Sequence, residues 1–99
     1  MRIFVYGKNG CDLCKSAQTK VRHFLDKWGV SASVEVLFMD METEFGAAEG
    51  DFYDVFEIPS VLVMTDDGRL AGRWDGQAPA SEELKAVALP PSQAVSAAA

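Results

Sequence analysis

The hydrophobic and polar positions in the first part of the chain predict a strand, a helix and a second strand. Residues 3–6 form an aromatic and β-branched run that ends at a glycine-rich turn, which is typical of a buried strand. Apolar residues then recur at steps of three and four over 13–28, and Gly29 follows, which predicts an amphipathic helix of about 17 residues. The apolar run at 34–39, broken only by Glu35, predicts a strand covered on both faces. The apolar positions of the helix are Leu13, Ala17, Val21, Phe24, Leu25 and Trp28.

This order of elements is a βαβ unit, so the first two strands should be parallel. Residues 41–57 are acidic and less regular, and their apolar residues indicate one or two short helical turns. Residues 60–64 predict a third strand and 70–74 a fourth, with the turn at 66–68 pairing them as an antiparallel hairpin.

The last predicted element is a short helix. Ser81 is the expected N-cap, two acidic residues follow it, and the helix should run to about Leu89, where two prolines end it. These elements predict an α/β fold with a single domain over 1–89 and a disordered tail over 90–99.

Length and composition narrow the class of protein further. A chain of 99 residues has room for one compact domain. It contains no apolar run near the roughly 20 residues of a membrane-spanning helix, and no signal peptide precedes the first strand. We therefore expect a cytoplasmic monomer that does not engage a membrane.

The net charge of −6 is distributed unevenly. Residues 1–30 hold six basic and two acidic side chains, a net charge of +4, whereas residues 31–99 hold three basic and thirteen acidic ones, a net charge of −10. Binding to nucleic acid needs clustered Lys and Arg, so this balance argues against a nucleic-acid partner.

The candidate chemistry lies in the two cysteines, Cys11 and Cys14, at the start of the first predicted helix. A bridge across so short a loop stabilises a fold weakly, so a chemical role is the better explanation. The free N–H groups of a helix N-terminus stabilise a thiolate at Cys11, and Lys8 and Lys15 act in the same direction. Asp12 opposes them, since a carboxylate beside Cys11 disfavours the thiolate.

The spacing predicts a thiol–disulfide exchange mechanism. Cys14 follows Cys11 by one helical turn, within reach of an intramolecular disulfide. Cys11 would attack a substrate disulfide and form a mixed disulfide, and the more buried Cys14 would then attack Cys11 and release the product. Lys8 would assist electrostatically.

Other interpretations of the two cysteines remain open. The same spacing is half of a zinc site, but there is no third cysteine, and His23 lies nine residues after Cys14, a rotation of about 900° to the opposite face of the helix. We therefore expect no metal within one chain and a solvated His23. A metal or iron–sulfur cluster shared between two chains, a non-catalytic binding module and a pair of inert core cysteines are the alternatives.

Two segments carry a resemblance to known proteins. The segment 5–14, Val-Tyr-Gly-Lys-Asn-Gly-Cys-Asp-Leu-Cys, resembles the active-site entry of the glutaredoxins. Ile58-Pro59-Ser60, just before an apolar strand, resembles the cis-proline motif of the thioredoxin superfamily. The resemblance implies a thioredoxin fold, with a central four-stranded mixed sheet flanked by about three helices. In the numbering of the family core, the strand order would be 3-1-2-4.

The resemblance also implies ligands and partners. Ile58 and Pro59 would contact the backbone of an extended substrate, although an ordinary trans proline that begins a strand is the alternative. Asp75 would receive the amine of glutathione, and Lys8 its carboxylate. The expected partners are a disulfide-containing protein and an electron donor, either glutathione or a thioredoxin reductase, with no bound cofactor. The pair between the cysteines, Asp12-Leu13, matches neither thioredoxins nor glutaredoxins.

Overall fold

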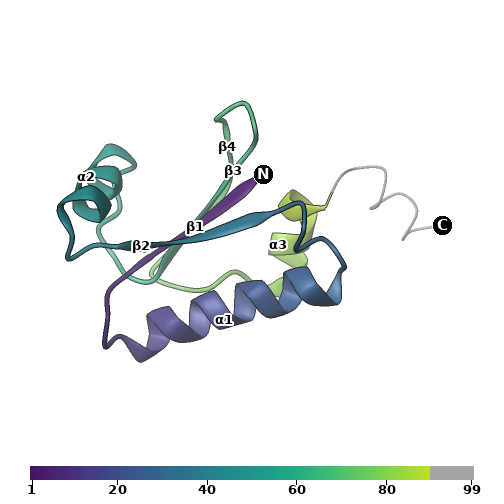
Figure 1. Ribbon diagram of the computed structural model, residues 1–99, viewed down its shortest axis with the longest axis horizontal. Helices are drawn as coiled ribbons and strands as arrows, with labels where there is room; N and C mark the ends of the chain where they lie inside the picture. Colours follow the sequence, from purple (N-terminus) through teal and green to yellow (C-terminus); the bar gives the residue numbers. More distant parts are fainter. Residues whose placement is uncertain (90–99) are drawn as a thin grey trace.

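The computed structural model of the protein describes residues 1–89 (Figure 1). The predicted α/β class, with a four-stranded mixed sheet and three helices, is confirmed for these residues. The tail predicted over 90–99 lies outside them. In chain order the elements are β1 (Arg2–Gly7), α1 (Asp12–Lys27), β2 (Glu35–Asp40), α2 (Glu44–Phe52), β3 (Ser60–Met64), β4 (Leu70–Asp75) and α3 (Ser81–Ala88).

The strands lie in the order β2-β1-β3-β4. The predicted parallel pairing of β1 with β2 is confirmed, as is the antiparallel hairpin of β3 and β4, and β1 pairs antiparallel with β3. When the strands are numbered along this chain, the order 3-1-2-4 implied by the resemblance is wrong. That order would place β4 beside β2, whereas the short hairpin places it beside β3. Strand β1 is therefore central, and its end is where the cysteine segment begins.

Helices cover both faces of the sheet, with α1 and α3 on one side and α2 on the other (Figure 1). Side chains of a strand point alternately to its two faces, so β1 contributes to both cores. Ile3 and Val5 pack with α1 and α3, while Tyr6 packs with Leu62 on the α2 side. Trp74 is buried in the same core as Ile3 and Val5.

Helix α1 buries Cys14, Ala17, Val21 and Leu25, at steps of three and four residues. The prediction that Leu13 lies on the buried face was wrong, because its side chain is 72% exposed and Cys14 takes the inward position one residue later. Gly29 follows the helix with φ +73°, a conformation that glycine adopts without a steric penalty.

Strand β2 differs from the prediction of a strand covered on both faces. Within residues 1–89 it is an edge strand, paired only with β1, and most of its side chains are half-buried. Val36 and Phe38 pack on the side of α1, and Leu37 and Met39 pack on the other side with Tyr6.

The two short helices have different N-caps, and the N-cap of α3 is not the predicted one. Thr43 caps α2, since its hydroxyl accepts the N–H of Gly46 at 3.0 Å. For α3 the N-cap is Ala80, not Ser81, which is the first residue of the helix. The Ala80 N–H donates to the Glu83 carboxylate at 3.3 Å, so an acidic side chain in the first turn supplies the missing cap interaction.

Candidate active site

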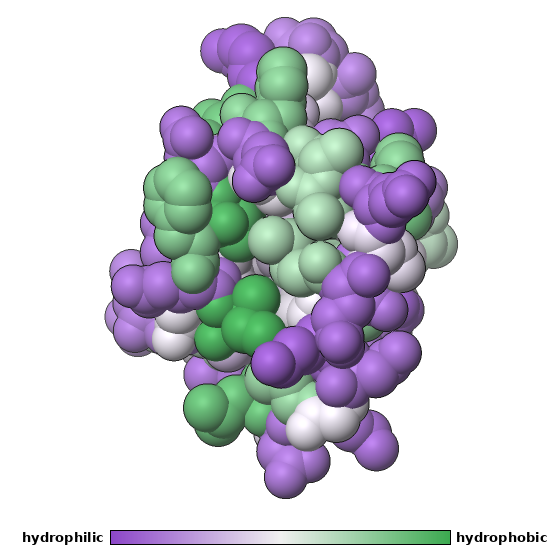
Figure 2. All heavy atoms as spheres, turned by 90° about the vertical axis from the view of Figure 1, so that its left-hand side faces the viewer, coloured by the Kyte–Doolittle hydropathy of each residue, from purple (hydrophilic) through white to green (hydrophobic). Residues whose placement is uncertain are grey.

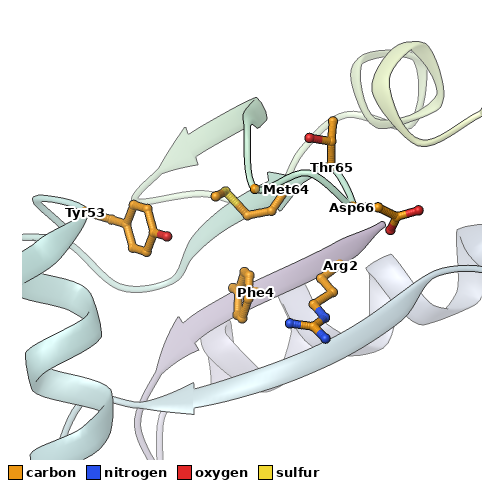
Figure 3. A pocket seen from close by; sticks show the side chains of 7 residues that line it. Arg2, Phe4, Tyr53, Met64, Thr65 and Asp66 are labelled. Carbon is orange, nitrogen blue, oxygen red and sulfur yellow. The ribbon is translucent and has the colours of Figure 1, made fainter.

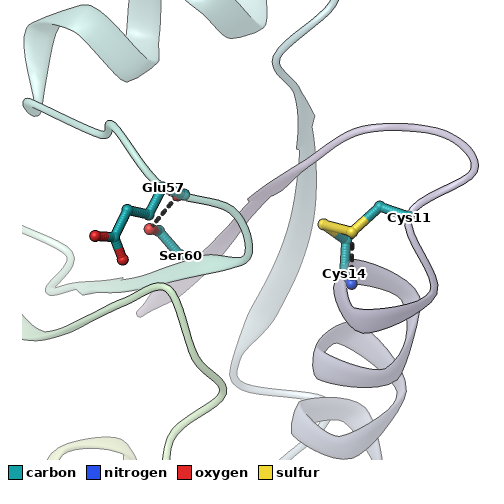
Figure 4. Close-up of a disulfide and its surroundings, with 4 residues drawn as sticks. All are labelled: Cys11, Cys14, Glu57 and Ser60. Carbon is teal, nitrogen blue, oxygen red and sulfur yellow. Dashed lines mark hydrogen bonds between the residues drawn. A yellow bond between two sulfur atoms is a disulfide. The ribbon is translucent and has the colours of Figure 1, made fainter.

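Cys11 occupies the N-cap position of α1, and its sulfur lies where that helix presents its free N–H groups. The Cys11 Sγ accepts the backbone N–H of Cys14 at 3.1 Å. The two cysteines form a disulfide, with their Cα atoms 5.3 Å apart (Figure 4). A donor aimed at Sγ favours the negatively charged thiolate over the neutral thiol once the pair is reduced.

The two cysteines differ in exposure. Cys11 is half-buried, whereas Cys14 has 0% of its surface exposed. Of the two cysteines, Cys11 is therefore the one with surface open to solvent. This asymmetry agrees with the predicted division between an attacking and a resolving thiol.

Gly7, at the end of β1, makes room for Cys14, and the sequence analysis did not single it out for this role. A Cβ at position 7 would lie 2.7 Å from the Cys14 Cβ and 2.8 Å from its Sγ. Real Cβ atoms do not approach so closely, so any larger residue would displace Cys14. The sequence indicates this role only through a glycine directly after the predicted strand at 3–6.

A cavity of about 470 Å³ opens beside Cys11. Lys8 and Lys15 both line it, so the two cations that were expected to favour the thiolate face the same space as Cys11. Phe38 of β2 forms an apolar wall, a second residue that the sequence analysis did not identify as part of a site. The remaining lining residues are Asn9, Gly10, Asp12 and Gln18.

Ile58 and Pro59 lie beside the end of β1, just before the neighbouring strand β3 begins. The register pairs Ser60 with Tyr6, so the segment before Ser60 lies beside Gly7 and the loop that leads to Cys11. The Ile58–Pro59 peptide bond is cis, Pro59 is buried and Ile58 is partly exposed. Figure 4 shows the turn between Glu57 and Ser60 facing the disulfide.

Hydrogen bonds hold this turn in place. The Ser60 hydroxyl donates to the Glu57 carbonyl at 2.6 Å, which closes the turn around Ile58 and Pro59. The Arg73 guanidinium, from β4, donates to the carbonyl oxygens of Tyr53 and Asp54 at the other end of the segment. The turn before β3 is therefore fixed from both ends.

Asp75 ends β4, opposite Ser60 in the register, and does not line the cavity beside Cys11. Its carboxylate accepts from the Nε of Arg73 at 3.0 and 3.1 Å. This hydrogen bond and the charge of Asp75 raise the pKa of Arg73. Asp75 borders a separate cavity of about 210 Å³ with Asp54, Phe56, Glu57 and Arg73. Its role toward glutathione stays a prediction.

A further cavity, of about 420 Å³, lies at the other end of β1 (Figure 3). Arg2, Phe4 and Tyr53 border it, and no cysteine does. It is therefore separate from the cysteine chemistry.

Within residues 1–89, no group of three or more His, Cys, Asp and Glu side chains is placed to hold a metal ion. His23 is exposed on α1, as expected for a solvated residue. None of the helices in this part of the chain combines the length and the apolar character needed to cross a membrane.

No protein-family profile and no curated protein sequence matches the chain. Solved structures do. Thioredoxin 1 from Thermosipho africanus superimposes with a TM-score of 0.63 at 15% identity, over 99% of this chain and 98% of that one. Thioredoxin-2 of the malaria parasite superimposes with a TM-score of 0.69 at 15% identity, over 88% and 79% of the two chains. Mitochondrial thioredoxin 3 of Saccharomyces cerevisiae gives 0.65 at 18% identity, over 88% and 76%.

The chain has a thioredoxin fold. The fold expected from the resemblance is thereby confirmed. In this thioredoxin-fold protein, a disulfide-forming Cys-x-x-Cys pair begins the helix that follows the central strand. That combination is a thiol oxidoreductase-like arrangement.

Proposed function

We propose that the protein is a thiol–disulfide oxidoreductase with Cys11 as the attacking thiol and Cys14 as the resolving thiol. One observation carries the proposal: the half-buried Cys11 Sγ sits at the N-cap of α1 and accepts the N–H of a fully buried partner cysteine at disulfide distance. Such a sulfur is a stabilised and accessible thiolate when reduced, and the thiolate is the nucleophile in disulfide exchange.

In the first step, the Cys11 thiolate attacks one sulfur of a substrate disulfide. A bond forms between Cys11 Sγ and that sulfur, the substrate disulfide breaks, and the other substrate sulfur leaves as a thiolate that takes a proton from water. Lys8 and Lys15 line the cavity beside Cys11 and favour the anionic sulfur species there. Ile58 and Pro59 are the proposed contact with the substrate backbone.

In the second step, Cys14 loses its proton and attacks the Cys11 sulfur of the mixed disulfide. The Cys11–Cys14 disulfide forms, and the second substrate sulfur leaves as a thiolate that is then protonated. The substrate disulfide has gained two electrons and the dithiol has lost them. Gly7 supports this step, because its missing side chain leaves the space that Cys14 occupies.

The proposed partners are a disulfide-containing protein and an electron donor that returns the two electrons. The candidate donors are glutathione, for which Lys8 and Asp75 are the proposed contacts, and a flavin-dependent thioredoxin reductase. Oxidised protein can be incubated with NADPH plus either glutathione and its reductase or a thioredoxin reductase. NADPH consumption that depends on this protein then identifies the donor.

The experiment for the proposal is reduction of insulin disulfides in the presence of a chemical reductant. Wild-type protein should accelerate insulin precipitation, and Cys11→Ser should return the rate to that of the reductant alone, because it lacks the nucleophile. Cys11→Ser as active as wild type contradicts the proposal. If protein purified without oxygen is a coloured or zinc-loaded dimer that does not reduce insulin, the result would support the alternative of a metal or iron–sulfur cluster shared between two chains.

A further inference from the structure

Three phenylalanines on the α2 side of the molecule point into solvent. Phe45 and Phe52 of α2 are 68% and 76% exposed, and Phe56, in the segment that follows, is 83% exposed. We call these three side chains the aromatic ridge. Large apolar side chains at such exposure lose the free energy of burial, and a group of them marks an interaction surface.

The geometry of α2 explains why the ridge faces outward. Gly46 and Gly50 form the buried side of the helix, and a Cβ at Gly46 would clash with the Asp40 carbonyl. Phe45 and Phe52 are seven residues apart, two helical turns, so they lie on the same side about 10 Å apart along the axis. Because its glycines let the backbone of α2 pack closely onto the sheet, the aromatic side chains of this helix face solvent.

The segment that carries the ridge is joined at both ends to parts of the candidate active site. The Met41 N–H, just before α2, donates to the Gly7 carbonyl at 2.8 Å, which ties the start of this segment to the end of β1. At the other end, Phe56 lies two residues before Ile58. Figure 2 looks onto the end of the molecule where α2 lies and α1 begins, and shows hydrophobic side chains gathered there among hydrophilic ones.

The segment that carries the ridge is acidic. Residues 41–57 contain no Lys or Arg, and the acidic residues among them are Glu42, Glu44, Glu49, Asp51, Asp54 and Glu57. Arg73 of β4, which borders a cavity with Phe56, is paired with Asp75. An apolar strip bordered by carboxylates complements a ligand that carries both apolar and basic side chains. A second copy of this chain would bring like charges together at the same surface, so self-association is disfavoured.

We propose that the aromatic ridge docks a polypeptide segment rich in Lys or Arg and in apolar residues, next to the disulfide that Cys11 attacks. The position of that disulfide rests on the proposed function, whereas the docking itself does not. Apolar side chains of the segment cover Phe45, Phe52 and Phe56, and its basic side chains face the surrounding carboxylates. The ridge then selects protein substrates by sequence near the disulfide.

The test measures docking without redox chemistry. Two labelled, cysteine-free peptides share the same Leu and Phe positions, one with Lys and the other with Glu at the remaining positions. Binding is followed by fluorescence anisotropy at low and high salt. The Lys peptide should bind, more weakly at high salt, and the triple variant Phe45→Ser/Phe52→Ser/Phe56→Ser should weaken it about tenfold.

Leu70→Ser is the matched control, because Leu70 is also an exposed apolar residue, at 46%, but lies on β4 outside the ridge. It should leave binding unchanged. The single Phe→Ser variants, checked by circular dichroism, replace the triple variant if that one does not fold. Equal binding of the two peptides, or unchanged binding in the ridge variants, overturns the proposal. A wild-type dimer that the ridge variants dissociate would instead identify a second copy as the occupant.

This outcome is separable from the proposed function. If the wild-type protein binds the Lys peptide but does not reduce insulin, the proposed enzyme activity is refuted and the docking surface stands. If it reduces insulin but does not bind the peptide, the docking surface is refuted and the enzyme activity stands.

Discussion

At the scale of single residues, the reactivity of Cys11 depends on groups that act in opposite directions. The Cys14 N–H and the two lysines of the cavity favour the thiolate. Asp12, the first residue of α1, lines the same cavity and carries a negative charge. The helix terminus gains from an acid in its first turn, but the neighbouring thiolate does not.

Asp12→Asn should lower the pKa of the Cys11 thiol, because it removes a negative charge beside the anion. Alkylation of reduced protein by iodoacetamide below neutral pH should then be about two- to threefold faster than in wild type. Asp26→Asn, an exposed acid near the other end of α1, is the control and should leave the rate unchanged. A profile of rate against pH that does not move downward in Asp12→Asn refutes this role for Asp12.

Tyr6 gives a second residue-scale prediction, through pH. Burial, followed by the negative charges of Glu49 and Tyr53, raises its pKa to about 12, against about 10 in the unfolded chain. Between these two values the folded state keeps a proton that the unfolded state has lost. Stability should therefore be unaffected by Tyr6 below about pH 10 and fall by about 1.4 kcal/mol per pH unit between about pH 10 and pH 12.

The measurement is urea unfolding of wild type and Tyr6→Phe across this alkaline range. The variant has no hydroxyl to ionise, so its stability should decline less steeply, and the difference between the two proteins isolates Tyr6 from other groups. Parallel declines would show that the ionisation of Tyr6 is not linked to unfolding.

At the scale of elements, the sequence predicted β1, α1 and the β3–β4 hairpin because their hydrophobic periods match their geometry. The hydrophobic pattern did not predict the structure where glycines or a neighbouring cysteine, rather than large apolar side chains, determine the packing. The inward face of α2 is glycine, so its phenylalanines face solvent, and Leu13 is exposed because the cysteine beside it takes the buried position. Gly7 and Phe38 were missed for a related reason, since their roles arise only when separate strands meet the cysteines.

The turn before β3 offers an element-scale prediction. Arg73→Ala removes the donors to the Tyr53 and Asp54 carbonyls and the ion pair with Asp75, so unfolding should require about 2 kcal/mol less free energy. Arg69→Ala is the matched control, because Arg69 forms an ion pair with Asp67 in which both side chains are largely exposed. Urea unfolding of the two variants tests this. Equal losses would contradict an anchoring role for Arg73.

At the scale of the whole molecule, the uneven charge of the chain corresponds to two neighbouring surfaces. The basic first 30 residues contain β1, the cysteine segment and α1, and two of their cations, Lys8 and Lys15, line the cavity beside Cys11. The acidic part contains α2 and the aromatic ridge. A net charge of −6 therefore conceals a locally positive setting for the thiolate beside a negative docking surface.

The central claim is that Cys11 attacks and Cys14 resolves. The most direct test is the intact mass of reduced Cys14→Ser after incubation with a peptide disulfide, followed by peptide mapping. Without its resolving thiol, this variant should accumulate one mixed disulfide, located on Cys11, and a reductant should release it. A Cys14→Ser protein that gains no peptide mass, while Cys11→Ser forms an adduct through Cys14, would contradict the assignment.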